Sequence, residues 1–326
     1  MNKHVLITGA TSGMGLSHAI YLTSRGYSVI GTSRRADNID LEQLKEGYIR
    51  DHTKYRYINK GKTEVKPGKI LISSEIHQNL DKYLEDIQYL SMDVTKTNSV
   101  TRAFQKLDNI DVLINNAGIA HFGPIETYPL EMVQNQFEVN FYGYIRVIQA
   151  ILPKMREQEK GQIINTSSLA GLTAIPFMGY YSASKAAILR LSESLRIELR
   201  PYNIWVSSLL PGDINTPGNT VTAHLYNEDK KFKSIDIKDM VDAIPLTKDS
   251  LYFEHGNVAW TTIMRNLIIS PPPIVVSKKI EKIIRAKRPK IHYKSGSKLQ
   301  TWGVTFMKRL FPENLTTRIM AMFYGL

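Results

Sequence analysis

The stretch that decides the fold lies close to the amino terminus and reads Val5-Leu6-Ile7-Thr8-Gly9-Ala10-Thr11-Ser12-Gly13-Met14-Gly15. Its first residues form a short apolar run, which suits a buried strand, and apolar residues then recur at helical spacing from Leu16 to Leu22. Glycines permit a tight turn and let the backbone approach a pyrophosphate, and free N–H groups at a helix start attract phosphates. The stretch predicts a dinucleotide site in an α/β fold. Its Gly-xxx-Gly-x-Gly spacing differs from the better-known Gly-x-Gly-xx-Gly, and a plain glycine-rich turn is the alternative.

The next strand-like run, residues 27–32, bears on which dinucleotide is bound. Ser33-Arg34-Arg35 follows it, and no carboxylate occurs before Asp37. An acidic residue here would hydrogen-bond the ribose 2′-hydroxyl of NAD, whereas arginine accommodates the 2′-phosphate of NADP through paired N–H donors. We therefore expect NADP(H) in preference to NAD(H), with Arg34 as the leading contact and Arg35 beside it. The alternative is that one or both arginines are solvated loop charges.

A second informative stretch is Tyr181-Ser182-Ala183-Ser184-Lys185, which places a phenol and an ammonium four residues apart. On a helix these two side chains share one face, about 5–6 Å apart at Cβ. A nearby lysine cation favours the phenolate and lowers the tyrosine pKa from its ordinary value of about 10. A tyrosine tuned in this way exchanges a proton with an alcohol or carbonyl oxygen. The pair carries little weight alone, because surface helices produce it by chance.

Several further elements occur in one order along the chain. They are Asp93-Val94 after the strand-like residues 89–92, Asn115-Asn116-Ala117-Gly118 after residues 112–114, Asn140, Ser168 thirteen residues before Tyr181, and Pro211-Gly212 followed by Thr216. Together with the glycine turn and the Tyr–Lys pair, they make residues 3–217 resemble the short-chain dehydrogenase/reductase family in its shorter-motif branch. The resemblance implies a Rossmann-like fold of the α/β class, with one doubly wound parallel sheet and helices on both faces.

The same resemblance implies an oxidoreductase whose catalytic residues are Asn140, Ser168, Tyr181 and Lys185. Tyr181 would exchange a proton with the substrate oxygen, and Ser168 would hold that oxygen. Lys185 would lower the phenol pKa and hold ribose hydroxyls, and Asn140 would carry a water. The residues expected to bind the cofactor are Gly9, Thr11, Ser12, Gly13, Met14, Gly15, Arg34, Arg35, Asp93, Val94, Asn116, Ala117, Gly118, Tyr181, Lys185, Pro211, Gly212, Ile214 and Thr216. We expect Ser167 and Tyr180 to pack or to line the substrate pocket.

The composition fits this class and excludes several others. The chain has 326 residues, 43% of them hydrophobic, which suits one large α/β domain with additions. It has no cysteine, so disulfides and thiolate metal sites are excluded, and its eight histidines lack the spacing of metal ligands. No run of about 18 apolar residues occurs, so we expect no membrane span. The sequence enters a strand at once and leaves no room for a signal peptide, which predicts a cytoplasmic location.

The net charge of +12 is concentrated at the carboxyl terminus. Residues 274–326 hold 12 lysines and arginines against only Glu281 and Glu313, a net of +10. Within them, residues 298–311 and 315–324 look like two short amphipathic helices broken near Pro312. Their apolar faces either pack over the substrate pocket or a partner subunit, or contact an anionic membrane as a peripheral anchor. We expect no nucleic-acid partner, because no module of that kind is present.

The predicted organisation is a catalytic Rossmann domain over residues 1–273 and a basic helical extension over residues 274–326. The domain would contain an insertion at about 47–80 and a substrate loop at about 213–265. In the insertion, residues 69–73 suggest an added strand, and the position in the sequence places the insertion on the adenosine side. By analogy with the family, we expect a homodimer or homotetramer that pairs through helices within residues 130–157 and 180–199.

The extension also bears on the substrate. Residues 289–296 resemble a segment of hydroxysteroid- and retinol-dehydrogenase-like members of the family, which implies a lipophilic alcohol, ketone or aldehyde of steroid, retinoid or long-chain type. Aromatic residues such as Phe232, Tyr252 and Trp260 would line its pocket or pack in the core. Two alternatives stay open. One is a reductase of 3-oxoacyl thioesters whose basic tail docks an acidic carrier protein, and the other is a non-catalytic NADP-binding sensor or scaffold.

Overall fold

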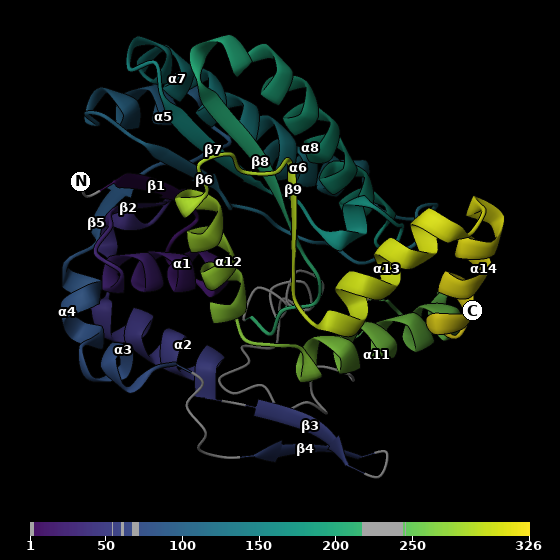
Figure 1. Ribbon diagram of the computed structural model, residues 1–326. Coiled ribbons are helices and arrows are strands. Elements are labelled where there is room, and N and C mark those ends of the chain that lie inside the picture. The colour runs from purple at the N-terminus through teal and green to yellow at the C-terminus, as the bar shows by residue number, and fades with distance from the viewer. Residues whose placement is uncertain (1–2, 54, 60–61, 67–71, 217–243, 245) are drawn as a thin grey trace.

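The computed structural model describes residues 3–53, 55–59, 62–66, 72–216, 244 and 246–326. Within these ranges, seven parallel strands form one sheet in the spatial order β5-β2-β1-β6-β7-β8-β9 (Figure 1). Their bounds are β1 His4–Thr8, β2 Ser28–Ser33, β5 Gln88–Ser91, β6 Val112–Asn115, β7 Gly161–Thr166, β8 Ile204–Pro211 and β9 His292–Ser295. The order reverses direction between β1 and β6, which makes this the switch point of a doubly wound sheet.

Helices cover both faces of the sheet, as the sequence predicts. The bounds on one face are α1 Gly13–Ser24, α2 Leu41–Thr53, α3 Ser74–Gln78, α4 Leu80–Glu85 and α12 Ile274–Arg285. Those on the other face are α5 Thr97–Gln105, α7 Gly143–Glu157 and α8 Gly179–Glu198, with α6 Leu130–Phe137 and the π-helix η2 Glu138–Tyr142 preceding α7. Short 3-10 turns lie at Ala36–Asn38, Leu169–Gly171 and Arg200–Tyr202.

Side chains of the central strands point alternately to the two faces of the sheet, so a hydrophobic core forms on each face. Val5 and Ile7 of β1 are fully buried on the α1 side, while Leu6 between them is fully buried on the α7 side. Successive side chains of a strand point to opposite faces, so an uninterrupted apolar strand requires helices on both. The predicted fold class is confirmed.

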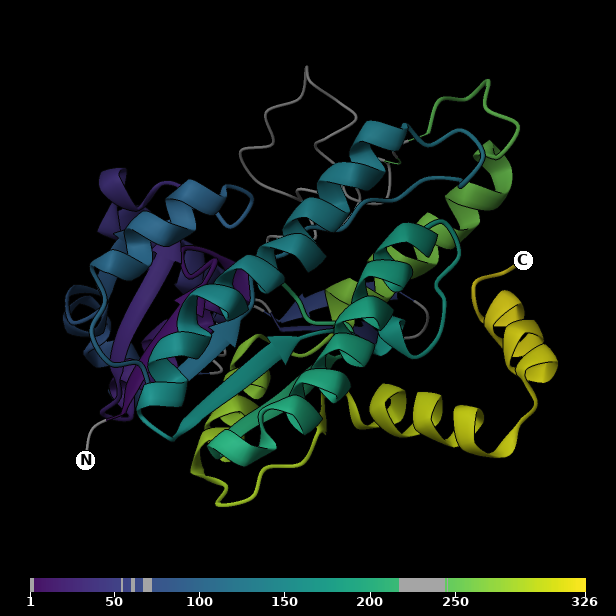
Figure 2. The same ribbon diagram turned by 90° about the horizontal axis from the view of Figure 1, so that it is seen from above.

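The first part of the predicted extension, α12 and β9, belongs to the sheet domain. Helix α12 buries Val276, Ile280 and Ile284 beside α1, and β9 pairs with β8 as the last strand of the sheet. Helices α13 Lys298–Leu310 and α14 Glu313–Phe323 then follow on either side of Pro312. Figure 2 shows α13 and α14 at the end of the molecule away from the amino terminus. None of the helices in the described ranges is both long and apolar enough to span a bilayer.

The insertion forms an antiparallel hairpin of β3 Tyr55–Asn59 and β4 Lys62–Lys66. Of the strand predicted at residues 69–73, residues 69–71 lie outside the described residues, and Ser73 instead caps α3. The hairpin itself differs from the expected position on the adenosine side, because β3 lies beside α11 Phe253–Ile269 (Figure 1). Other residues of the insertion, Ile72 and Ile76, pack in the core that contains α1. Five-residue strands extend about 17 Å, so a hairpin reaches well beyond the point where its sequence is inserted.

Candidate active site

The glycine turn joins the end of β1 to the start of α1, and its backbone geometry requires glycine. Gly9 and Gly13 have φ angles of +68° and +51°, which L-residues rarely adopt. A Cβ atom at Gly15 would lie 2.0 Å from the carbonyl oxygen of Gly9. The turn is fixed to the neighbouring strand, since the backbone N–H groups of Asn116 and Ala117 donate to Thr8 Oγ1 at 2.9 and 3.0 Å.

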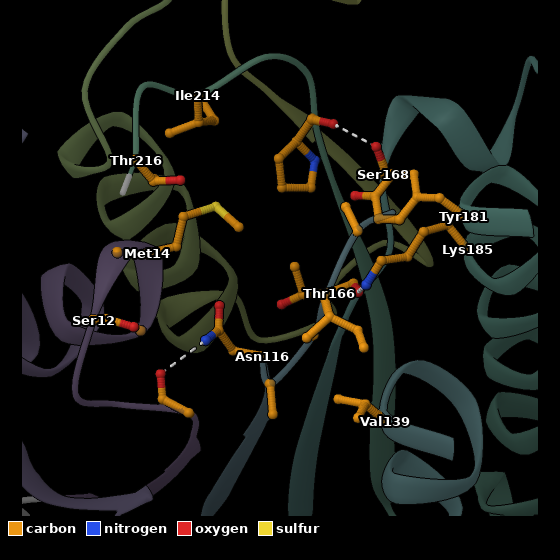
Figure 3. A pocket seen from close by; sticks show the side chains of 18 of the residues that line it. Ser12, Met14, Asn116, Val139, Thr166, Ser168, Tyr181, Lys185, Ile214 and Thr216 are labelled. Carbon is orange, nitrogen blue, oxygen red and sulfur yellow. Dashed lines mark hydrogen bonds between the residues drawn. The ribbon is translucent and has the colours of Figure 1, made fainter. Parts of the chain in front are cut away.

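The start of α1 has the properties of a phosphate site. Ser12 occupies the N-cap without a side-chain capping bond, and the first turn carries no acidic residue. The helix dipole and the free N–H groups of a first turn attract an anion there. Figure 3 shows Ser12, Met14 and Asn116 on one side of the cavity that this turn borders.

The adenosine end of the same cavity is polar. Arg34 lines the cavity, whereas the adjacent Arg35 does not. Thr11 Oγ1 donates to Ser33 Oγ at 3.0 Å, which ties the glycine turn to the end of β2. Asp93 and Val94 line the cavity at the end of β5, and one carboxyl oxygen of Asp93 accepts from Thr95.

Asn140 lies in the π-helix η2, an element that often marks functional sites. Its fully buried amide accepts from the N–H of Ile119 and donates to the carbonyl of Ile119, both at 2.8 Å, and also donates to Ser184 Oγ at 3.1 Å. Asn140 does not itself line the cavity, and it fixes the backbone just after Gly118. A Cβ atom at Gly118 would lie 3.4 Å from Lys185 Nζ, so this backbone runs directly past the lysine.

Tyr181, Lys185 and Ser168 come together at the carboxyl ends of β7 and β8 (Figure 3). Lys185 Nζ donates to the carbonyl of Thr166 at 3.1 Å and lies 5.8 Å from the centre of the Tyr181 ring. Ser168 Oγ accepts from the N–H of Ala170 at 3.1 Å and donates to the carbonyl of Pro211 at 3.4 Å. The side chains of Lys185 and Ser168 are therefore held by backbone groups.

The electrostatics of this cluster differ from the expectation in one respect. Burial lowers the pKa of Lys185 to about 8. The pKa of Tyr181 is raised, first by burial and then by the charge of Asp213, while a hydrogen bond with Ser168 acts in the opposite direction. We expected the lysine to lower the phenol pKa, but loss of hydration is the largest influence here and raises that pKa. A phenol that stays protonated is the form that donates a proton to a substrate oxygen.

The adjacent residues that the sequence left aside have packing contacts. Ser167 Oγ donates to the carbonyl of Lys185 at 2.7 Å, and Tyr180 donates to the carbonyl of Ile125 at 3.0 Å. Ser167 thereby fixes the turn of α8 that carries Lys185, and Tyr180 holds the loop that contains Ile125. Ser167 also lines the cavity, whereas Tyr180 does not, and the choice of Ser168 and Tyr181 over their neighbours stays a prediction.

One cavity of about 640 Å³ connects these parts. Every predicted catalytic or cofactor residue lines it except Arg35 and Asn140. Beyond Tyr181 the cavity has an apolar wall that the sequence identified only through Trp260; its other members are Ile175, Met178, Ile263, Met264, Leu267 and Tyr324. Of the other aromatic candidates, Tyr252 contacts Glu126 outside the cavity, and Phe232 lies outside the described residues.

The cavity fits a dinucleotide along its length. Its phosphate end is a glycine turn that a larger residue would fill, and its far end carries the phenol, the hydroxyl and the ammonium. In the part of the chain that the structure describes, no three His, Asp or Glu side chains gather as a metal site would need. A site of this kind defines a nucleotide-dependent oxidoreductase.

Comparison with known sequences identifies the family. A family model described as short chain dehydrogenase matches residues 70–225. A 3-ketodihydrosphingosine reductase of Bacteroides thetaiotaomicron is 35% identical over 65% of this chain and 64% of its own length. A probable short-chain type dehydrogenase/reductase of Helicobacter pylori is 32% identical over 69% of each chain, and human retinol dehydrogenase 8 is 33% identical over 66% of this chain and 60% of its own. The chain belongs to the short-chain dehydrogenase/reductase family.

Solved structures agree with this fold. A short-chain dehydrogenase from Streptomyces avermitilis superposes with a TM-score of 0.66 at 22% identity, covering 99% of this chain and 95% of its own. A serine dehydrogenase complexed with NADP+ has a TM-score of 0.62 at 22% identity, over 90% and 94% of the two chains. A Burkholderia phymatum family member in complex with NAD has a TM-score of 0.64 at 19% identity, over 97% and 95%. The fold thus accommodates either nucleotide.

Proposed function

We propose that this enzyme uses NADP(H) to interconvert a lipophilic alcohol and its ketone or aldehyde. The observation that carries this proposal is the apolar wall of Trp260, Ile263 and Met264, which continues the cofactor cavity beyond Tyr181 and Ser168. A substrate that enters between this wall and the phenol loses water from its apolar part and presents its oxygen to two hydrogen-bond donors.

The chain's own groups would act on that oxygen as follows. A bound nicotinamide cofactor would supply the hydride in reduction or accept it in oxidation. Tyr181 donates its phenolic proton to the oxygen of the reduced carbonyl, and the raised pKa of the phenol keeps that proton in place until then. The hydroxyl of Ser168 would turn from the Pro211 carbonyl, 3.4 Å away, to donate a hydrogen bond to the same oxygen and stabilise its developing charge. Lys185, held at the Thr166 carbonyl, places its ammonium 5.8 Å from the centre of the phenol ring. Alcohol oxidation follows the same path in reverse.

The names of two relatives support a lipophilic substrate, since one is a 3-ketodihydrosphingosine reductase and another a retinol dehydrogenase. The alternative of a 3-oxoacyl-thioester reductase rests on the basic charge of residues 274–326, which would attract an acidic carrier protein. Pairing into a homodimer or homotetramer through α7 and α8 stays a prediction.

A substrate panel tests the proposal. We expect purified enzyme to oxidise NADPH, and NADH more slowly, in the presence of long-chain ketones, ketosteroids or retinal. An acetoacetyl thioester should be a poorer substrate, because it lacks the apolar body that fits the wall. A preference for the thioester would favour the carrier-protein alternative, and absence of turnover on every compound would contradict the proposal.

Two adjacent arginines provide a matched comparison for the cofactor in the same assay. Arg34→Ala should weaken NADPH binding about tenfold or more with little effect on NADH, because a charge-assisted contact to the 2′-phosphate is lost. Arg35→Ala, which removes an equal charge outside the cavity, should change the NADPH constant much less. Equal effects of the two variants would mean that neither arginine contacts the phosphate specifically.

We also propose that α13 and α14 rest on an anionic membrane surface. Tyr324, which caps α14, and Met320 within α14 pack against the apolar cluster of Trp260, so one face of α14 covers the pocket. The other face exposes Leu299 at 82%, Trp302 at 66% and Met322 at 77% of their surfaces. Exposed cations lie among them, including Lys298, Arg309 and Arg318. Apolar side chains flanked by cations suit the interface of an anionic bilayer, where a lipophilic substrate is dissolved.

Vesicle flotation tests this surface. The protein should bind phosphatidylcholine vesicles that contain phosphatidylglycerol at least about tenfold more strongly than pure phosphatidylcholine, since each nearby cation adds roughly 1 kcal/mol. Trp302→Glu should reduce binding, whereas Leu251→Glu, at a residue 93% exposed outside these helices, should not. Binding that ignores lipid charge, or that both variants reduce equally, would favour the partner-subunit interpretation.

A further inference from the structure

One carboxyl group in the cavity has no part in the chemistry described above. Asp213 follows Pro211 and Gly212 at the end of β8, and it lines the cavity together with Tyr181 and Tyr324. Ser168 donates to the carbonyl of Pro211, so Asp213 lies two residues from the group that holds the catalytic serine. A charged group at this position is unexpected in a pocket with an apolar wall.

The carboxyl group is held in place by the C-terminal extension. Gln300 of α13 accepts from the backbone N–H of Asp213 at 3.1 Å through Oε1, and its Nε2 donates to Asp213 Oδ2. One amide therefore fixes both the backbone and the side chain. The Asp213 turn is also braced by β9, because the N–H of Gly212 donates to the carbonyl of Ser295 at 2.7 Å. A side chain fixed in this way is preorganised for a ligand.

The carboxyl group lacks a cation of its own. Across the described ranges no lysine, arginine or histidine forms an ion pair with Asp213, and Gln300 is its side chain's one hydrogen-bond partner there. Of the two cations that line the cavity, Arg34 lies at its adenosine end, and Lys185 is bonded to the Thr166 carbonyl instead. Asp213 is partly buried. A carboxylate that has lost part of its hydration and has no counter-ion is costly, and the cost is reduced when a ligand supplies the positive charge.

The charge of this group acts on both sides of the cavity. It raises the pKa of Tyr181 and the pKa of Tyr324, which belong to α8 and to the C-terminal segment. Burial raises the pKa of Asp213 itself, and the hydrogen bond from Gln300 opposes that change. Asp213 lines the same cavity as Tyr181, and it follows by two residues the Pro211 carbonyl that Ser168 contacts. Its carboxyl group is therefore placed to meet a substituent near the reacting carbonyl.

We propose that Asp213 binds a cationic amine on the substrate, close to the carbonyl that is reduced. The substrate would then be a long-chain amino ketone, or the matching amino alcohol in the reverse direction. Its oxygen would meet Tyr181 and Ser168, its ammonium would meet Asp213, and its chain would follow the apolar wall. This inference rests on the proposed function and specifies the substrate class within it.

A matched pair of ketones tests the inference. One is a long-chain ketone with an amino group on the carbon next to the carbonyl, and the other has the same chain without the amine. The wild-type enzyme should favour the amino ketone in kcat/KM, and Asp213→Asn should lower the ratio of the two values by about 10- to 100-fold. Asp213→Glu, which keeps the charge, should retain more of the preference, and Asp249→Asn controls for loss of a carboxylate elsewhere.

The outcomes separate this inference from the proposed function. Turnover of both ketones with no preference for the amine would overturn the role of Asp213 and leave the proposed function standing. An equal loss on both ketones in Asp213→Asn would also overturn it, because the carboxyl group would then serve the turn or the nicotinamide. Failure of the wild type on both ketones would contradict the proposed function, and the inference with it. The N-acetylated amino ketone, which is neutral, should behave like the plain ketone.

Discussion

Replacing Tyr181 with phenylalanine is expected to lower ketone reduction by about 10²- to 10⁴-fold, the range that general acid catalysis contributes. The phenol is the one group in the described cavity whose proton lies beside both Ser168 and the Lys185 ammonium. Its raised pKa keeps that proton on the oxygen at neutral pH. Phenylalanine retains the ring and removes the proton, so the pocket keeps its shape while the chemistry stops.

The measurement separates chemistry from binding. Turnover is followed through NADPH absorbance, and cofactor affinity through the quenching of protein fluorescence. Tyr181→Phe should retain NADPH binding within a few-fold of the wild type. Tyr180→Phe is the matched control, since it removes a neighbouring phenol that donates to the Ile125 carbonyl, and it should stay active. If Tyr181→Phe kept most of its activity, another proton donor would have to be sought.

Local sequence patterns predict much of this architecture. The apolar run before Gly9 and the helical spacing after Gly15 determine β1, the turn and α1, because burial on both faces and a glycine-only backbone leave few alternatives. The order of the later motifs then places Asn116, Ser168 and Pro211 at adjacent strand ends. Parallel strands present their carboxyl ends at one edge, so residues far apart in the chain meet there.

The substrate wall has no such local signal. Gln300 lies in α13 and Tyr324 caps α14, and the sequence of these amphipathic helices indicates an apolar face but not what that face covers. Gln300 reaches Asp213 only because β9 adds to the sheet edge and brings α13 over the β8 turn. Asp213 itself, one residue after the predicted Gly212, looks in the sequence like an ordinary loop carboxylate. The positions of these residues in the cavity depend on tertiary contacts, which spacing in the sequence cannot predict.

The direction of the Tyr181 pKa illustrates the same limit. The four-residue spacing to Lys185 indicates a charge effect, and the structure does place the ammonium 5.8 Å from the ring centre. The spacing of two residues in a sequence does not show how much water surrounds them. Burial is the largest influence on both pKa values, lowering that of Lys185 to about 8 and raising that of Tyr181. From the sequence, the phenolate and the ammonium look as if they stabilise each other. In the structure, burial disfavours the charged form of both side chains.

Replacing Gly15 with alanine adds only one methyl group, yet it should strongly disrupt the phosphate site. Its Cβ would lie 2.0 Å from the backbone carbonyl oxygen of Gly9 and 2.7 Å from Asn116 Nδ2, and neither a backbone oxygen nor a side chain tied to Thr8 can yield freely. The turn must shift, and with it the N–H groups that face the pyrophosphate. We expect NADPH affinity to fall about 100-fold, the effect of a displacement of about 1 Å at a functional site. The free energy of unfolding should fall by about 1–3 kcal/mol.

Gly303 of α13 is the matched control, because a Cβ atom there meets no heavy atom within 4 Å. Gly303→Ala should leave NADPH binding unchanged and stabilise its helix by up to about 1 kcal/mol, since alanine is the better helix former. Calorimetric titration with NADPH and thermal unfolding of both variants distinguish a local clash from a general intolerance of alanine. Because the clash is with the backbone of the turn, a Gly15→Ala protein that bound NADPH like the wild type would show that the pyrophosphate does not approach this turn, and the cofactor site would have to be placed elsewhere in the cavity.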